Sequence, residues 1–158
     1  MKKLGADISK RVSGTGNPMY GKPSPQGSGN GWSGWYKGWF FRSIRELSYM
    51  IKVIEANELQ WNKPESLKWE DGDKFRTYTP DFLINENLVV EIKPKNLWNS
   101  HAVKKKAEAA KIWCTERNMN YELIDPVSLS TADVIELYKT KQIKFLDRYD
   151  KKFKETYL

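Results

Sequence analysis

The chain has 158 residues, of which 39% are hydrophobic, and this is enough for one compact domain with extensions. A mean hydropathy of −0.72 and the lack of any apolar run near the ~20 residues that span a bilayer exclude a membrane-embedded class. The first residues lack the apolar segment of a secretion signal, and a single cysteine, Cys114, excludes an internal disulfide and a cysteine-based zinc site. We therefore expect a cytoplasmic protein whose one cysteine is buried in a helix.

The net charge of +7 is unevenly distributed. Residues 1–40 carry six basic side chains and one acidic side chain, residues 41–91 carry seven and ten, and residues 92–158 carry fourteen and nine. An acidic centre between basic flanks is typical of an enzyme that binds a polyanion at its margins and acts on it in an acidic pocket. Solvated basic helix faces are also common, so charge alone leaves both alternatives open.

Residues 1–38 are predicted to form an extended arm. Residues 13–38 are rich in Gly, Ser, Pro and Trp and show neither helical nor alternating periodicity. Extended basic arms can follow a DNA groove and contact its phosphates, and Lys37 is a candidate for such a contact. Trp32 and Trp35 could stack on bases or pack against their own domain, and both alternatives stay open. For Trp39 and Phe40 we expect packing.

A helix is predicted to begin after Ser43. Its apolar residues recur at helical spacing, which indicates one buried face: Ile44, Leu47, Ile51 and Ile54. Ser43 and Glu46 have the spacing of a capping box, in which the Glu46 carboxylate would bond back to the Ser43 N–H. Glu46 also borders the apolar face, where a carboxylate could support a metal site, and the two roles are compatible.

Two short strands and then a hairpin follow this helix. Leu67–Glu70 and Phe75–Tyr78 read as strands joined at Asp71-Gly72. In the next segment Asn85-Glu86-Asn87 separates two apolar runs, Phe82-Leu83-Ile84 and Leu88-Val89-Val90.

The register of this hairpin places two acids opposite each other. A loop centred on Glu86 pairs Leu83 with Val89 and sets Asp81 against Glu91, with Cβ atoms roughly 4.5–5.5 Å apart. Lys93 lies two residues further along the strand and shares the face of Glu91. The opposite face is apolar and predicted to be buried: Phe82, Ile84, Leu88, Val90 and Ile92.

Two carboxylates and a lysine on one face suit metal-dependent hydrolysis of phosphodiesters. Mg²⁺ is commonly held by one or two carboxylates together with waters and phosphate oxygens. A bound metal polarises the phosphoryl group, and a nearby lysine can orient water or neutralise developing charge. The same residues on an exposed sheet could be merely solvated, so the pattern alone is weak.

The remaining chain is predicted to be mostly helical. Pro94 ends the second hairpin strand, residues 102–117 read as a helix, and Tyr121–Ile124 reads as a strand parallel to its neighbour. Ser130 and Asp133 can cap a further helix, and the tail from Gln142 to Tyr157 has a helical pattern. Outside the arm, basic residues are candidate phosphate contacts: Arg42, Arg45, Arg76, Lys95, Lys104, Lys105 and Lys106. A role for the lone histidine, His101, stays open.

Pro80-Asp81 followed by Glu91-Ile92-Lys93 resembles the PD-(D/E)XK nuclease signature. The segments Phe41–Glu46, Tyr78–Ile84 and Val90–Pro94 resemble phage-type endonucleases of that superfamily, including free-standing homing endonucleases, and are similar to the N-terminal nuclease of Tn7-type transposases. The resemblance covers the central half to two-thirds of the chain. It implies that Asp81 and Glu91 are metal ligands, Lys93 is the catalytic lysine, and Glu46 is an additional acidic ligand.

A second resemblance concerns the arm. Asn17-Pro18-Met19-Tyr20-Gly21-Lys22-Pro23 resembles a nuclease-associated modular DNA-binding motif, although the helical half that often follows that motif is not evident. It implies DNA contacts by Asn17, Tyr20 and Lys22.

These observations predict a mixed α/β fold with an αβββαβ restriction-endonuclease-like core, an N-terminal arm and C-terminal helices. The expected domains are an arm (1–38), a nuclease core (39–127) and a helical extension (128–158). We expect a site-specific endonuclease for double-stranded DNA that uses Mg²⁺, with Mn²⁺ able to substitute. A phage homing endonuclease acting inside a bacterial host is the first interpretation, and a homo-oligomer would allow both strands to be cut. The alternatives are a repair or transposition nuclease that needs a partner, and a non-catalytic DNA-binding module.

Overall fold

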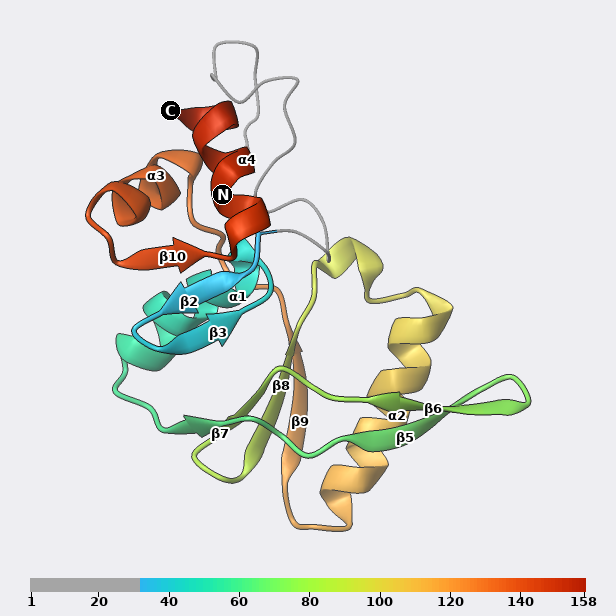
Figure 1. The fold of residues 1–158 in the computed structure, drawn as a ribbon. Helices are drawn as coiled ribbons and strands as arrows, with labels where there is room; N and C mark the ends of the chain where they lie inside the picture. The colour runs from blue at the N-terminus through green and yellow to red at the C-terminus, as the bar shows by residue number, and fades with distance from the viewer. Residues whose placement is uncertain (1–31) are drawn as a thin grey trace. The chain divides into compact units, whose positions relative to one another are not determined.

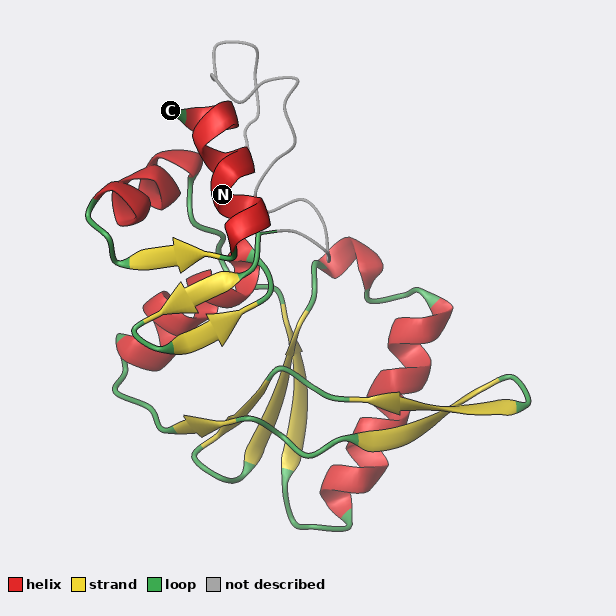
Figure 2. Ribbon diagram, in the orientation of Figure 1, coloured by secondary structure: helices red, strands yellow, loops and turns green. Residues whose placement is uncertain are grey.

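The computed structural model describes residues 32–158, and the chain divides into two compact units. The first contains residues 32–51 together with Pro126–Leu158, and the second contains Lys52–Asp125. Both helices and strands are present in the described chain, so the mixed α/β fold class is confirmed (Figures 1 and 2). The predicted arm motif with Asn17, Tyr20 and Lys22 lies outside the described residues. None of the helices within residues 32–158 combines the length and the apolar character that crossing a membrane requires.

The first unit is a three-stranded antiparallel sheet with helices. Its elements are β2 (Gly34–Tyr36), β3 (Trp39–Phe41), α1 (Ile44–Tyr49), α3 (Thr131–Lys139), β10 (Ile143–Phe145) and α4 (Asp147–Tyr157). The strand order is β10-β2-β3. One face of this sheet packs against the helices. The core of the unit includes Phe41, Phe145 and Phe153, each at most 1% exposed.

Two elements of this unit correct the sequence-based expectations. Residues 34–36, predicted as part of an irregular arm, form β2, and residues 143–145, predicted as part of a helical tail, form β10. The reason is pairing between distant segments, since Ile143 pairs with Tyr36 and Phe145 with Gly34. Helix α4 begins only at Asp147, while the capping box of Ser130 and Asp133 on α3 is confirmed.

The first helix continues from one unit into the other. Helix α1 passes into a π-helical segment, η1 (Met50–Glu55). Of the apolar residues predicted to be buried, Ile44, Leu47 and Ile54 are fully buried and Ile51 is half-buried.

The second unit contains the predicted hairpin. Its elements are β4 (Trp61–Asn62), β5 (Leu67–Asp71), β6 (Lys74–Tyr78), β7 (Phe82–Ile84), β8 (Leu88–Ile92), η2 (Lys95–Leu97), α2 (His101–Thr115) and β9 (Asn120–Ile124). The order β4-β7-β8-β9 forms one sheet, and β5 and β6 form a separate hairpin. Strand β9 runs parallel to β8, as predicted for a crossover through a helix. Helix α2 packs against β5 and β9, and it buries Cys114 as expected.

The observed register of β7 and β8 is the predicted one. Leu83 pairs with Val89, and Ile84 pairs with Leu88. Asn85 and Glu86 adopt positive φ values of 50° and 65° at the turn, a conformation that asparagine tolerates better than most residues. The apolar face is buried at Phe82, Ile84, Val90 and Ile92, while Leu88 is half-buried.

Candidate active site

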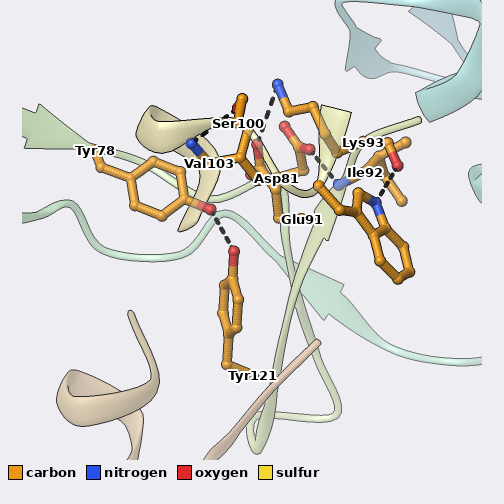
Figure 3. A network of polar contacts seen from close by, with 9 residues as sticks. Tyr78, Asp81, Glu91, Ile92, Lys93, Ser100, Val103 and Tyr121 are labelled. Carbon is orange, nitrogen blue, oxygen red and sulfur yellow. Dashed lines mark hydrogen bonds and ion pairs between the residues drawn. The ribbon is translucent and has the colours of Figure 1, made fainter. Parts of the chain in front are cut away.

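The open end of the β7–β8 hairpin brings Asp81 and Glu91 together. The paired residues of this hairpin end at Phe82 and Val90, and Asp81 and Glu91 are the next residues outward on the two strands. The Asp81 N–H donates to Val90 O at 3.1 Å, and the Ile92 N–H donates to Asp81 Oδ2 at 2.8 Å. The main chain of β8 therefore holds both the backbone and the carboxylate of Asp81 (Figure 3).

Lys93 follows β8 directly, and hydrogen bonds hold both its main-chain N–H and its carbonyl. Its N–H donates to Ile124 O at 2.9 Å, and its carbonyl accepts from Trp98 Nε1 at 2.7 Å. Its Nζ lies 3.9 Å from Glu91 Oε2, on the face predicted from strand alternation. Asp81, Glu91 and Lys93 thus come together as the sequence predicted, and Figure 3 shows their side chains gathered at this end of the hairpin.

The two acids, Asp81 and Glu91, are both half-buried, which is unusual for carboxylates. The Glu91 side chain is only 13% exposed. Burial, followed by the nearby charge of Asp81, raises the pKa of Glu91 to about 8, against the opposing effect of the Lys93 charge. Burial also raises the pKa of Asp81, although the Ile92 N–H and the Lys93 charge favour its ionised form. Two neighbouring acids with raised pKa values are typical of functional sites.

A pair of tyrosines beside Glu91, Tyr78 and Tyr121, was not identified by the sequence analysis. Tyr78, on β6, is 5% exposed, and its hydroxyl lies 3.0 Å from the Tyr121 hydroxyl on β9. Burial raises the pKa of both phenols, so both stay protonated. The Tyr78 hydroxyl and the Lys106 charge both favour the ionised form of Glu91. Tyr78 lies three residues before Asp81, but only the fold shows which strand faces it.

Lys106 does not project freely from α2. Its Nζ lies 5.4 Å from the Trp69 ring centroid and 5.5 Å from that of Tyr78, in cation–π geometry. Lys104 and Lys105, in contrast, are exposed. Of the three adjacent lysines predicted as phosphate contacts, Lys106 is therefore the one held by its own domain.

The donor set fits a divalent metal ion. Glu91 Oε1 is buried without a hydrogen-bond partner in the described structure, and a buried carboxylate oxygen of that kind calls for a ligand. Among residues 32–158 no group of three or more His, Cys, Asp or Glu is close enough to hold a metal. Two carboxylates are sufficient for Mg²⁺, which keeps waters and substrate oxygens in its other positions.

Glu46 has an observed local role in the first unit. Its N–H donates to Ser43 Oγ at 3.1 Å, so Ser43 caps α1 as predicted. The Glu46 carboxylate accepts from the Arg42 N–H at 3.2 Å, one residue before the expected N–H of Ser43. The supporting metal role of Glu46 stays a prediction.

The other predicted DNA-binding residues differ in exposure. Trp32 is 3% exposed and its ring contacts those of Phe145 and Phe153. Of its two alternatives, packing against its own domain is therefore favoured, because little of the indole is left to stack on a base. Trp35 is 39% exposed.

The basic candidates also differ in exposure. Arg76 is exposed and paired with Asp71, and Arg45 is half-buried. Exposed basic candidates are Lys37, Arg42 and Lys95.

One protein family matches the central part of the chain. Residues 48–125 match the family described as TnsA-like endonuclease N terminal, which belongs to the PD-(D/E)XK nuclease superfamily. The matched segment contains Asp81, Glu91 and Lys93, whereas Glu46 precedes it. No curated protein and no solved structure matches the chain. Residues 48–125 are therefore similar to a family of endonucleases.

Proposed function

We propose that this TnsA-like endonuclease domain hydrolyses phosphodiester bonds of double-stranded DNA with the help of a divalent metal ion, most simply Mg²⁺. The observation that carries the proposal is the half-buried pair of Asp81 and Glu91 with Lys93 Nζ 3.9 Å from Glu91 Oε2. An ordinary solvated hairpin would not bury two acids next to each other, because desolvation disfavours their charged forms.

Each residue of this group has a separate role. Asp81 and Glu91 would hold the ion, which when bound would polarise the phosphoryl group and make water more acidic. Lys93 is kept at the site by the hydrogen bonds of its main-chain N–H and carbonyl. Its ammonium group would orient the attacking water or offset the negative charge that develops on phosphorus-bound oxygens.

DNA would be held mainly through its phosphates. Lys95, Lys104 and Lys105 are exposed and close in sequence to the catalytic lysine. Contacts of this type position a duplex without reading its sequence. The predicted contacts of the arm residues Asn17, Tyr20 and Lys22 would add to this binding.

Two biological roles are compatible with such a site. The family match favours a transposition nuclease, which would cut with a partner protein. The resemblance of residues 17–23 to a nuclease-associated motif favours a free-standing homing endonuclease.

The test is cleavage of supercoiled plasmid and of phage and host genomic DNA by the purified chain, with Mg²⁺ or Mn²⁺ and with EDTA. Discrete metal-dependent fragments would support the nuclease and the free-standing role. Metal-dependent nicking without discrete fragments would support the nuclease and favour the partner-dependent role. DNA binding without cleavage under either metal would contradict the proposal and favour a binding module.

A further inference from the structure

The outer face of the β10-β2-β3 sheet carries a row of side chains that the nuclease chemistry does not use. Trp35 pairs with Lys144 on one side and with Phe40 on the other, so the three lie in one line across the sheet. Alternate residues of the same strands are buried, as expected for a sheet covered on one face only. The three side chains of the row are exposed.

The two aromatic residues form one exposed patch. Trp35 is 39% exposed and Phe40 is 37% exposed, and their ring centroids are 5.3 Å apart with the planes inclined at 60°. Arg42 lies over the Phe40 ring, with its guanidinium carbon 5.8 Å from the centroid. The exposed parts of these two rings, with a guanidinium group beside them, offer a surface on which a further planar ring can stack.

Basic groups lie at both ends of the row. Arg42 is at the Phe40 end. At the other end Lys144 helps to line a pocket of about 450 Å³, together with Lys139 and Lys141. Asp150 also lines this pocket, but its Oδ1 accepts from the Tyr138 hydroxyl at 2.6 Å and its Oδ2 pairs with Lys154 at 3.2 Å. The negative charge of Asp150 is therefore compensated, and Lys144 carries the exposed positive charge at this end of the row.

We infer that this sheet face, with Trp35 and Phe40 at its centre and Arg42 and Lys144 at its ends, binds unpaired nucleotides of a DNA strand. A base can stack on an exposed aromatic ring, while neighbouring phosphates are neutralised by the basic groups on either side. An apolar protein partner would not need positive charge at both ends of the patch. The inference rests on the proposed function in that the chain acts on DNA, and it adds that the bound substrate includes unpaired bases.

The test is binding in EDTA, where no cleavage can occur. The full chain is titrated against a labelled oligothymidylate of roughly twelve nucleotides and against an oligonucleotide of equal length with abasic sites. The two carry the same phosphates, so any difference is due to the bases. We expect the oligothymidylate to bind roughly tenfold more tightly. Equal affinities would overturn the inference, and so would the absence of binding to either oligonucleotide, since that would leave the face to a protein partner.

Substitutions test whether the difference in affinity between the two oligonucleotides arises at this sheet face. Trp35→Ala and Phe40→Ala are each expected to remove most of the preference for bases, and Trp35→Phe to keep part of it. Phe75→Ala is the matched control, because Phe75 is 71% exposed in the other unit. Thermal unfolding of each variant checks its fold. Equal weakening of both oligonucleotides by folded Trp35→Ala and Phe40→Ala would contradict the inference.

The outcome is separable from that of the nuclease proposal. A base-dependent affinity would support the inference even if the chain cut no DNA. Metal-dependent cleavage with no preference for bases would leave the nuclease standing and remove this inference.

Discussion

The backbone N–H of Ile92 donates a 2.8 Å hydrogen bond to Asp81 Oδ2 across the open end of the β7–β8 hairpin. A main-chain donor has no rotamers, so it fixes the carboxylate more firmly than a side chain could. Because the same strand carries Glu91, one element positions both acids. The strand pairing that stabilises the hairpin therefore also assembles the candidate metal site.

Substituting Asp81 should separate its structural role from its chemical role. Asp81→Asn retains an oxygen that can accept from the Ile92 N–H, so it should keep most of the stability and lose metal binding. Asp81→Ala removes the acceptor and should cost about 1–3 kcal/mol of unfolding free energy. Urea denaturation and calorimetric metal titration of both variants provide the measurement. If Asp81→Asn bound Mg²⁺ as tightly as the wild type, Asp81 would not be a ligand.

The metal-free protein should lose stability as the pH rises. The Glu91 pKa is about 8 in the folded chain and 4.5 ordinarily, so the folded state holds this proton more tightly than the unfolded state. The stability due to the protonated acid is complete below pH 4.5 and is lost as the pH rises towards about 8. In EDTA the wild type should therefore become less stable relative to Glu91→Gln over this range, by up to about 1.4 kcal/mol per pH unit.

Unfolding by urea at a series of pH values measures this difference. Saturating Mg²⁺ at the upper end of the range should restore stability to the wild type but not to Glu91→Gln, because only the carboxylate binds the ion. Parallel pH profiles for the two proteins in EDTA would show that Glu91 has no raised pKa.

The close approach of β2 and β10 makes Gly34 a sensitive position. A Cβ at Gly34 would lie 2.3 Å from Lys144 O and 2.8 Å from Phe145 Cα, so the two backbones would have to separate. Gly38 has a φ of +82° and open space around a Cβ, so Gly38→Ala costs only the backbone strain of about 1–2 kcal/mol. We expect Gly34→Ala to lower the melting temperature clearly more than Gly38→Ala. An equal or smaller effect would contradict the observed strand pairing.

The exposed lysines of α2 should govern the salt dependence of DNA binding. Replacing both Lys104 and Lys105 by alanine removes two proposed phosphate contacts and should reduce the slope of log K against log salt by about 2. Lys106→Ala should instead lower stability, because Lys106 lies over Trp69 and Tyr78. Lys151→Ala, at an exposed position of α4, is the control. An unchanged slope for the double variant would remove these lysines from the DNA-binding surface.

The hairpin could be predicted because all of its signals are local. Two apolar runs of equal length, separated by Asn85-Glu86-Asn87, fix the loop, and the loop fixes which residues face each other. Asp81, Glu91 and Lys93 could therefore be placed on one face before the structure was known. Helix α2 and strand β9 were likewise predictable from periodicity and length.

Features that depend on distant pairing could not be predicted. Strand β10 has three residues, and its partner β2 lies more than a hundred positions earlier in the sequence, where glycines and tryptophans hide any alternation. Tyr78 and Tyr121 are 43 positions apart in sequence, and they meet because the β5–β6 hairpin and β9 both pack against α2, the hairpin through β5. No local pattern indicates either relationship.

The central claim is that Asp81, Glu91 and Lys93 form a metal-dependent site for DNA cleavage. Its most direct test compares the wild type with Lys93→Ala and Glu91→Gln in a plasmid cleavage assay with Mg²⁺, and measures DNA binding of each in EDTA. Glu86→Gln, at the exposed turn of the same hairpin, is the matched control. We expect cleavage by the wild type and Glu86→Gln, loss of cleavage in the other two variants, and unchanged DNA binding by Lys93→Ala. Undiminished cleavage by Lys93→Ala or Glu91→Gln would contradict it.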